Sequence, residues 1–576
     1  MSEAPEAQPA ACAPRHPPLL RDPAVWLAAL ALLASNLWKP LVVDDAAYYQ
    51  LARQISEHPF DPYGFAMAWR NVPMPAMLVL APAAFPYWWG AGIAIFGDDP
   101  VLWKLWAFPF ALVLCASLRD LLRRFAPGHE TPLLALCVLS PALLPHVNLM
   151  LDVPALALVL GAMALFLRAC DRDSAGLAAL AGVVAGLAMQ TKYPAVFSVS
   201  ALAVYAVSAR RVRLGIVCLG AATAIFAAWE TALAFRYGQS HFIVALLEGQ
   251  GSKARHPLGE LFVLMLTVLG GSAPVLGLLA ALGLRVRLRW ISGAALAVAV
   301  AFAIIPLLPG RPIAALMFEP RFTLRNLEIF LFLPLGVAVV GVAGAAVARS
   351  LRDPGVRGSP PRQMLLGWVA LELVGIVWMT PFMAVRRLMG LITALTLLLG
   401  SLLPPPPHRR SSALVWIAAF GAALTAIHWG AGFFDARARA FAAPRIEAAV
   451  HDLGGDPARE TIWVAGHWGY QFYTERLGMR QLVAGRSVLE SGDWVVTARY
   501  VARQQLPKIS GLSPPLAVFD VKSPWPWSAI PYAYAGAMPL RSQPDAQLRI
   551  SIQRVIEGSK LARLSPRDLE ADRASP

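Results

Sequence analysis

Residues 41–53 read LVVDDAAYYQLAR, and they follow the first apolar run of the chain that is long enough to cross a membrane. The stretch places two adjacent carboxylates, Asp44 and Asp45, at the end of that run. Carboxylates at a membrane surface are costly unless they are solvated, paired or functional. The pair is therefore the first candidate for a functional site, and the rest of the chain is expected to supply its scaffold and its partners.

The composition is that of an integral membrane protein. Of 576 residues, 57% are hydrophobic and only 15% are charged, whereas soluble domains average about 25% charged residues. A helix needs roughly 20 mostly apolar residues to cross the bilayer core. About thirteen such runs are predicted, near residues 24–43, 101–121, 131–147, 150–169, 175–190, 194–208, 213–235, 259–284, 291–309, 326–348, 364–383, 388–403 and 413–433.

The basic residues predict the orientation, because short cytoplasmic loops retain Lys and Arg. With the N-terminus inside, arginine falls in every alternate loop, in segments 15–21, 119–124, 168–172, 210–213, 285–289, 349–362 and 409–410. An odd number of spans then places the C-terminal segment outside, together with the Asp44–Asp45 pair. The net charge of +15 is largely this positive-inside bias, so a nucleic-acid partner is not expected.

Three regions follow from these patterns. Residues 1–23 are expected to form a disordered cytoplasmic tail, and residues 24–433 a membrane domain whose long first outer loop spans 44–100. Residues 434–576 have soluble character and predict a small extracytoplasmic α/β domain, with strands at 460–466 and 492–497 and helices at 446–453 and 470–477. The turn GHWGY at 466–470 is expected to be structural, with acceptor binding as the alternative.

Further polar groups fall on the predicted outer side. Asp152 lies in a short turn before the fourth run, where its simplest role is to cap the following helix. Lys192 lies in a tight turn, where a lysine commonly extends to lipid headgroups. Arg386 and Arg387 lie between the eleventh and twelfth runs, where the positive-inside rule does not explain them. Their partner is either a phosphate group or an ordinary acidic side chain.

These residue types suit group transfer. A carboxylate can act as general base toward a hydroxyl or amine acceptor, and outward cations can stabilise a leaving phosphate. Successive residues diverge in direction, so only one of Asp44 and Asp45 is expected to point into the site, while the other orients it or binds a metal. The five cysteines lie on the inner side or in apolar runs, so no disulfide framework is expected.

The order of three motifs resembles the GT-C glycosyltransferases. The motifs are DDAAY with Ala52-Arg53 after the first run, LDVP at 151–154, and GLAMQTKYP at 186–194. Within that superfamily the chain is most similar to the protein O-mannosyltransferase and lipid A aminoarabinose transferase group, over roughly residues 24–205. The resemblance implies a polytopic helical GT-C fold in a bacterial-type inner membrane, and an inverting transfer from a polyprenyl-phosphate sugar on the outer face.

The resemblance also implies roles for particular residues. The first-loop Asp would be the catalytic base, although relatives usually carry Asp-Glu where this chain has Asp44-Asp45. Asp152 would line the same cavity and Lys192 would approach the donor phosphate. Substrate binding is further expected at four residues: Tyr48, Arg53, Arg386 and Arg387. The pair Arg386-Arg387 stands where relatives have an Arg-Tyr element.

The donor contact has one further candidate. Arg70 occupies the place of a Lys-Pro element and is a candidate substitute for it. The sugar is not specified by the sequence, the acceptor is a lipid, a glycan or a protein, and a divalent metal is left open because two Asp do not complete a coordination set.

A rival function from another class is a flippase or transporter of lipid-linked sugars, which would use similar polar groups within the membrane. Transporters commonly show inverted repeats with broken helices at the midplane. In this chain the candidate residues instead gather at the predicted outer edge, and a soluble domain follows. A third hypothesis is a scaffold or sensor without catalytic activity, and it would require that the protein functions without the acidic pair.

Overall fold

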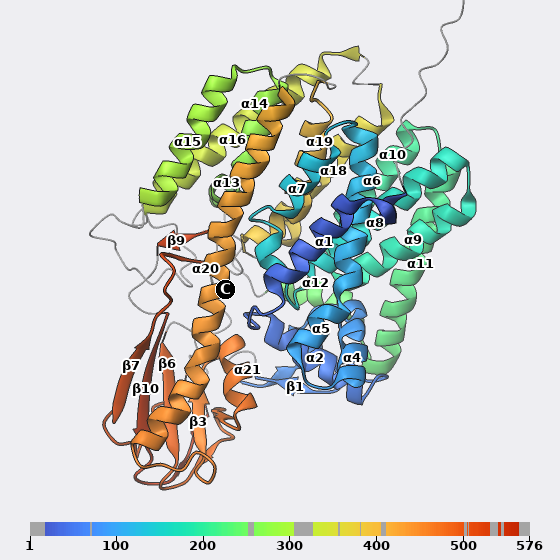
Figure 1. The fold of residues 1–576 in the computed structure, drawn as a ribbon. Coiled ribbons are helices and arrows are strands. Elements are labelled where there is room, and N and C mark those ends of the chain that lie inside the picture. Colours follow the sequence, from blue (N-terminus) through green and yellow to red (C-terminus); the bar gives the residue numbers. More distant parts are fainter. Residues whose placement is uncertain are drawn as a thin grey trace, which may run out of the picture.

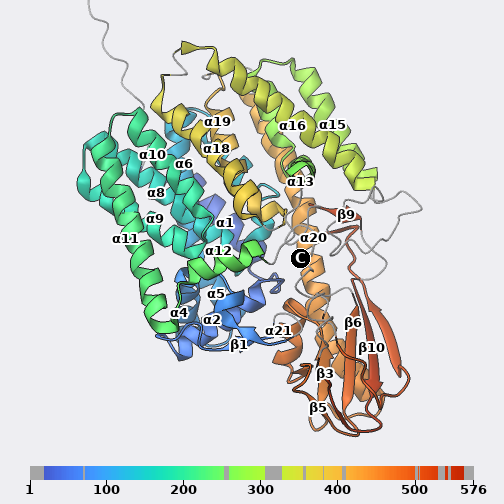
Figure 2. The same ribbon diagram turned by 180° about the vertical axis from the view of Figure 1, so that it is seen from behind.

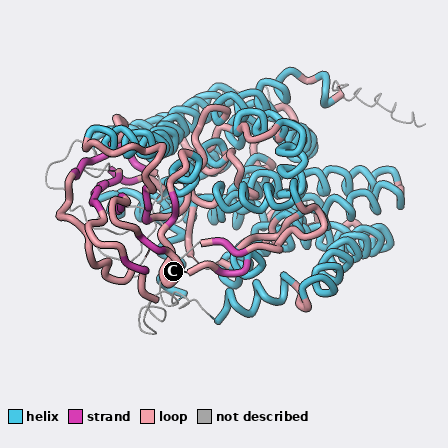
Figure 3. The backbone as a smooth tube through the Cα atoms, turned by 90° about the horizontal axis from the view of Figure 1, so that it is seen from below, coloured by secondary structure: helices cyan, strands magenta, loops and turns pink. Residues whose placement is uncertain are grey.

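The computed structural model describes residues 18–68, 72–251, 258–304, 327–354, 358–380, 382–404, 410–499, 504, 506–529, 539–542 and 547–563. A mostly helical body is joined to a small sheet domain, and the strands of this domain lie together on one side of the molecule (Figures 1 and 3). Arg70 and the predicted N-terminal tail up to residue 17 lie outside the described residues.

The helical body is built from these helices: η1 Leu19–Arg21, α1 Pro23–Asn36, α2 Asp45–Glu57, α3 Ala76–Val79, α4 Ala84–Phe96, α5 Pro100–Trp106, α6 Phe108–Phe125, α7 Glu130–Val138, η2 Leu144–His146, α8 Asp152–Arg172, α9 Ala175–Thr191, α10 Ala195–Ser208, α11 Val212–Tyr237, α12 His241–Gly251, α13 Leu258–Ser272, α14 Val275–Gly283, α15 Leu288–Ile304, α16 Leu327–Leu351, α18 Pro360–Met379, η4 Val385–Leu388, α19 Met389–Gly400 and α20 Arg410–Asp452. A short hairpin, β1 Ala66–Met67 with β2 Met74–Pro75, precedes α3.

The protein is a multi-pass membrane protein, but the predicted count of thirteen spans is not supported. Each predicted run overlaps a helix, yet among the described residues only six helices are long and apolar enough to cross a membrane. A seventh is added if α13 and α14 form one span, although they are bent by 82° at Ala273–Pro274. Apolar runs overestimate spans because apolar loops buried in protein give the same signal as helix; α1, for example, ends at Asn36.

Arginines of the predicted inner loops gather at one end of the helical body. Arg119 and Arg123 both bind Asp22, each at 2.8 Å between nitrogen and carboxylate oxygen. At the same ends of α6, α8 and α11, ion pairs join Arg124 to Asp171 and Arg211 to Asp173. These ion pairs place the start of α1 and the neighbouring ends of α6, α8 and α11 at one common face, and the orientation of the chain in the membrane stays a prediction.

Helices α9 and α11 pack closely at the edge of the body opposite the sheet domain (Figure 2). Gly182 and Gly186 form a GxxxG pattern on α9, a spacing that lets helix backbones approach in membranes. A Cβ atom added at Gly182 would lie 2.1 Å from the carbonyl oxygen of Cys218, and one added at Gly186 would lie 2.9 Å from that of Ala222. Glycine is therefore required at this contact.

Gly182→Ala is expected to destabilise the protein by about 1–3 kcal/mol, because the added methyl group forces α9 and α11 apart. The measurement is the thermal unfolding temperature of the detergent-solubilised protein. Gly176→Ala is the matched control on the same helix, since a Cβ there meets nothing within 4 Å and alanine favours helix. Equal unfolding temperatures for the two variants would contradict the prediction.

The C-terminal region contains the predicted α/β elements. The elements are β3 Ile462–Ala465, α21 Gly469–Arg476, β4 Arg480–Gln481, β5 Val488–Leu489, β6 Trp494–Arg499, β7 Ala517–Val521, β8 Trp527–Ser528, β9 Arg541–Ser542, β10 Leu548–Arg554 and β11 Ser559–Lys560. A five-stranded mixed sheet has the order β4-β3-β6-β10-β7. Strand β3 lies parallel to β4 and β6, while β10 is antiparallel to β6 and β7. The predicted strands at 460–466 and 492–497 thus correspond to β3 and β6.

Helix α20 connects the two parts without interruption. It spans 43 residues and runs through residue 434, where the sequence predicts the domain boundary (Figure 1). Its last turns pack against the sheet through Ile446 and Val450, in one buried cluster with Trp494 of β6 and Ile550 of β10. In the middle of the helix, Asp435 accepts hydrogen bonds from Ser528 Oγ (2.7 Å) and the Ala529 amide (2.8 Å).

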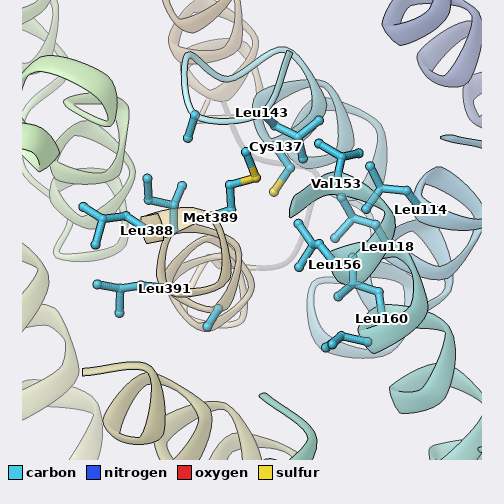
Figure 4. Packing of buried hydrophobic residues seen from close by; sticks show 14 of the residues in the cluster. Leu114, Leu118, Cys137, Leu143, Val153, Leu156, Leu160, Leu388, Met389 and Leu391 are labelled. Atoms are coloured by element: carbon cyan, nitrogen blue, oxygen red, sulfur yellow. The ribbon is translucent and has the colours of Figure 1, made fainter. Parts of the chain in front are cut away.

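The core of the helical body sets the position of η4. Leu388 and Met389 pack among buried side chains of α6, α7 and α8, including Cys137, Val153 and Leu156 (Figure 4). This packing brings the residues just before α19 beside the first turn of α8. Segments more than 200 positions apart in the sequence therefore meet at one end of the body.

Candidate functional site

The two adjacent carboxylates point to different neighbours. Asp44 precedes α2 and Asp45 is its first residue. The Asp44 Oδ2 atom lies 2.7 Å from Arg386 Nη2, whereas Asp45 Oδ2 accepts hydrogen bonds from the Val42 amide (2.8 Å) and from Asn148 Nδ2 (2.5 Å). The expected divergence of the pair is therefore present in the structure.

Asp45 belongs to a fully buried polar group. Its exposed fraction is 0%, and burial raises the pKa of its carboxyl above the usual range, against the opposing charges of Lys104 and Lys39. Lys104 also donates to the carbonyl of Asn36 (3.0 Å). This carbonyl lies at the C-terminal end of α1, where the helix dipole favours a cation. Asp45 thus joins the start of α2 to the turn at Asn148, while Lys104 joins α5 to the end of α1.

Asp44 belongs to a second cluster, which collects predicted site residues from four separate segments. Its side chain is 23% exposed, while those of Arg386 and Asp152 are 8% and 3% exposed. Asp152 forms an ion pair with Lys192, and its second carboxylate oxygen lies 3.8 Å from Arg386 Nη1. Tyr48, one turn into α2, is buried beside Asp44 and Arg386, and burial raises the pKa of its hydroxyl. We call these residues, with Arg387, the Asp44 cluster.

The structure decides two alternatives that the sequence left open. Asp152 is the first residue of α8, but no side chain caps this helix; its carboxylate binds Lys192 instead. Lys192 likewise turns toward Asp152, with 25% of its side chain exposed, and does not extend to solvent as a lipid-facing lysine would. Both residues therefore contribute their charges to the cluster.

Arg387 is the least satisfied charge of the cluster. Its guanidinium lies 4.2 Å from the centre of the Phe382 ring, and its buried Nε has no hydrogen-bond partner. Within the part of the chain that the structure describes, no carboxylate lies within ion-pair distance of it. Burial and the neighbouring Arg386 lower the pKa of Arg387 to about 10. With Arg386 and Lys192, it makes three cations against two carboxylates.

One predicted site residue, Arg53, is not brought to this cluster. Arg53 pairs with Glu57 one turn along α2, at 3.0 Å, and its side chain is 60% exposed. Arg53 lies on the surface because residue 53 faces away from the side of α2 that carries Tyr48 and Ala52. Arg70 lies outside the described residues, so its expected role as donor contact stays a prediction.

Sequence reasoning missed the polar residues around Asp45: Asn148, which donates to it, and Lys104 and Lys39, whose charges act on it. Asn148 lies four positions before Asp152 in the same outward turn, and Lys39 lies within the stretch that leads to Asp44. For Asn148 and Lys39, the signal in the sequence was a single polar residue among apolar neighbours, which suggests a buried polar contact. Lys104 gave the same signal inside the second apolar run, but nothing in the sequence shows that its side chain reaches α1.

A third polar network fixes the turn that carries Lys192. The neighbouring Tyr193 hydroxyl lies 2.8 Å from Glu230 Oε1 and 2.6 Å from His241 Nδ1. Gln190 also donates to Glu230 (3.0 Å), and His241 Nε2 donates to the Leu80 carbonyl (2.9 Å). The network links the end of α9 to α11, α12 and the loop after α3, so it holds the position of the Lys192 backbone.

Tyr193→Phe is expected to lower the free energy of unfolding by about 1–3 kcal/mol, because the lost hydroxyl leaves the buried His241 Nδ1 without its partner and removes one of the hydrogen bonds to Glu230. Denaturant titration of the solubilised protein measures the change. Tyr470→Phe provides the control, since the Tyr470 hydroxyl is buried without a hydrogen-bond partner. The network is not stabilising if both variants unfold at the same denaturant concentration.

A divalent metal held by protein ligands needs several donor groups that are free to bind it. Among the described residues, no group of three or more His, Cys, Asp and Glu side chains is placed to hold a metal ion. In the Asp44 cluster both carboxylates already have cationic partners. The described side chains of this cluster therefore do not fit a metal held by protein ligands alone.

The family comparison agrees with the resemblance noted in the sequence. Residues 81–233 match the family described as dolichyl-phosphate-mannose-protein mannosyltransferase. The matched part covers less than half of the chain, and it includes Asp152, Lys192 and the Tyr193–Glu230 contact. The predicted similarity to the protein O-mannosyltransferase group is confirmed over this part.

Solved structures show a more distant likeness. The crystal structure of ArnT from Cupriavidus metallidurans bound to undecaprenyl phosphate is 15% identical, with 92% of this chain and 97% of that chain covered and a TM-score of 0.40. The archaeal oligosaccharyltransferase AglB from Archaeoglobus fulgidus is 13% identical, with 82% and 69% covered and a TM-score of 0.38. Scores this low do not place a residue of one chain on another. No curated protein sequence matches the chain significantly.

Proposed function

We propose that this protein is an inverting glycosyltransferase that moves a sugar from a polyprenyl phosphate to an acceptor at the outer face of the membrane. The observation that carries the proposal is the Asp44 cluster: a partly exposed carboxylate stands beside a partly buried excess of positive charge. A cation shielded from water without a counter-charge is costly, and a phosphate group would supply that charge. Arg387 and Arg386 offer the planar donors that bind phosphate in two places.

In the proposed reaction Asp44 accepts the proton of the acceptor hydroxyl or amine. The freed electron pair of the acceptor forms a bond to the sugar C1, and the bond between C1 and the phosphate oxygen breaks. Its electron pair leaves with the polyprenyl phosphate, whose increased negative charge is stabilised by Arg386, Arg387 and Lys192. Attack opposite the leaving group inverts the configuration at C1.

Asp44 is a better candidate for the base than Asp45. A general base must reach the proton that it removes, and Asp44 is partly exposed whereas Asp45 has no exposed surface. The Oδ2 atom of Asp45 already accepts hydrogen bonds from the Val42 amide and from Asn148. Asp45 is therefore assigned a positioning role, and Asp152 is assigned the role of holding Lys192 and Arg386 in place.

The proposed setting is the outer face of a bacterial-type inner membrane, with the N-terminus in the cytoplasm and the sheet domain outside. Support comes from the arginine-rich face of the helical body, which lies at the predicted inner end. The acceptor class stays open between a lipid, a glycan and a protein. The proposal excludes a pure flippase, because a flippase has no need of a base beside the phosphate site.

The test uses purified protein reconstituted in liposomes with a panel of radiolabelled polyprenyl-phosphate sugars. Sugar release or transfer is measured in parallel with movement of the donor across the bilayer. The transferase proposal expects donor consumption that generates polyprenyl phosphate. Donor movement without consumption would instead support the flippase. Neither movement nor consumption, in the presence of an envelope extract that contains acceptors, would contradict both.

A further inference from the structure

The backbone just before Asp44 has an unusual conformation. Val43 has a φ of 48°, in the left-handed region that β-branched residues strongly avoid. The residue is buried, and hydrogen bonds fix the two residues before it. The Val42 amide donates to Asp45 (2.8 Å), and the Leu41 amide donates to the hydroxyl of Tyr473 (2.9 Å). Such strain persists only where the surroundings hold it.

Tyr473 belongs to α21 of the C-terminal domain, so a partner more than 400 positions away holds the strained turn. The approach is close: a Cβ added at Gly469 would lie 2.5 Å from the Leu41 carbonyl oxygen. Trp468, which precedes this glycine, is a second non-glycine residue with positive φ, at 66°. Strained residues thus lie on both sides of the junction.

The same helix contacts the start of α2 and the loop between α4 and α5. Tyr49 packs edge-on against Phe472, with ring centres 5.0 Å apart, and stacks on Trp103 at 5.1 Å. Arg476 donates to the carbonyl of Asp98 at 2.7 Å. We call this set, with Gly469 and Tyr473, the α21 contact; Figure 1 shows α21 beside α2 and β1.

We propose that the α21 contact positions Asp44: the C-terminal domain holds Val43 in its strained conformation and thereby aims the Asp44 carboxylate at the acceptor. The inference rests on the proposed function for the identity of the base. Tyr473 and Gly469 are positioning residues, because neither touches Asp44. Without the contact, Val43 would relax toward the extended region, and the peptide that carries Asp44 would rotate.

Tyr473→Phe removes one hydrogen bond and keeps the ring, so it tests the inference with little change in packing. Tyr470→Phe is the matched control on the same helix, because the Tyr470 hydroxyl has no partner. Hydrogen exchange of a peptide covering residues 38–43 is expected to be faster in Tyr473→Phe than in the wild type and the control. The kcat for donor turnover is expected to fall roughly tenfold or more, since small misplacements of a catalytic group have large effects.

Binding of undecaprenyl phosphate should stay within about twofold in Tyr473→Phe, because the phosphate-binding cations are not part of the α21 contact. Val43→Gly provides the specific check of the strain. Glycine adopts positive φ readily, so in a Val43→Gly background the effect of Tyr473→Phe on kcat is expected to shrink to about threefold or less.

Unchanged exchange in Tyr473→Phe would overturn the inference, as would a loss of kcat that Tyr470→Phe shares. An unchanged effect in the Val43→Gly background would overturn the role of strain. Failure of the proposed function looks different: the wild type itself consumes no sugar donor. The exchange data then still decide whether α21 holds Leu41, independently of any turnover.

Discussion

Asp44→Asn is expected to lower the rate of sugar transfer by roughly 10²- to 10⁴-fold, the usual contribution of a general base. The amide keeps the shape of the side chain but cannot accept the acceptor proton. The affinity for the polyprenyl-phosphate donor should stay the same or increase, because a negative charge beside Arg386 is removed. A large loss of kcat without weaker donor binding is the signature of a group that acts in the transition state.

The comparison variant is Asp45→Asn, which separates catalysis from stability. Asp45 is fully buried and accepts both of its hydrogen bonds through Oδ2, so the NH2 group of an asparagine would take the place of the buried Oδ1, where no acceptor is available. We expect a loss of stability of about 1–3 kcal/mol, with a smaller loss of kcat in the fraction that remains folded. Transfer kinetics and thermal unfolding of both variants measure the two effects. If Asp45→Asn removes turnover while Asp44→Asn retains it, the assignment of the base is reversed.

Arg387→Met is expected to weaken donor binding by roughly 10- to 100-fold, since a hydrogen bond to a charged group contributes about 1.5–3 kcal/mol. The same change should leave the unfolding temperature unchanged or raise it. Arg387 is partly buried, its buried Nε has no hydrogen-bond partner, and removal of an uncompensated charge from such a place is not costly. Methionine keeps the contact with the Phe382 ring.

Binding of undecaprenyl phosphate and thermal unfolding, measured side by side, test this prediction. Arg549→Met is the control for the loss of an arginine, because Arg549 pairs with Asp520 at 2.8 Å on the surface of the C-terminal sheet. That variant should bind the lipid as the wild type does. A destabilised Arg387→Met protein with normal lipid binding would show that Arg387 is a structural residue.

Several parts of the fold follow from local sequence patterns. The apolar runs locate helices, and the glycine-bounded segments locate β3 and β6, because periodicity and turn residues act over short distances. The number of spans does not follow from them, since an apolar segment that turns inside the protein looks like one that crosses the membrane. The break between α13 and α14 within one apolar run illustrates this limit.

The candidate site divides in the same way. The sequence by itself determined the membrane class, the arginine-rich face and the identity of Asp44, Asp152, Lys192, Arg386 and Arg387 as charges that need a reason in apolar surroundings. Only the tertiary structure decided that these five residues meet, that Asp45 is buried and hydrogen-bonded to Val42 and Asn148, and that Arg53 is not part of the site. Tertiary structure alone also decided that α21 reaches the turn at Val43. The physical reason is that ion pairs and close contacts depend on how the helices pack. A local sequence pattern does not show which residues, hundreds of positions apart, this packing brings together.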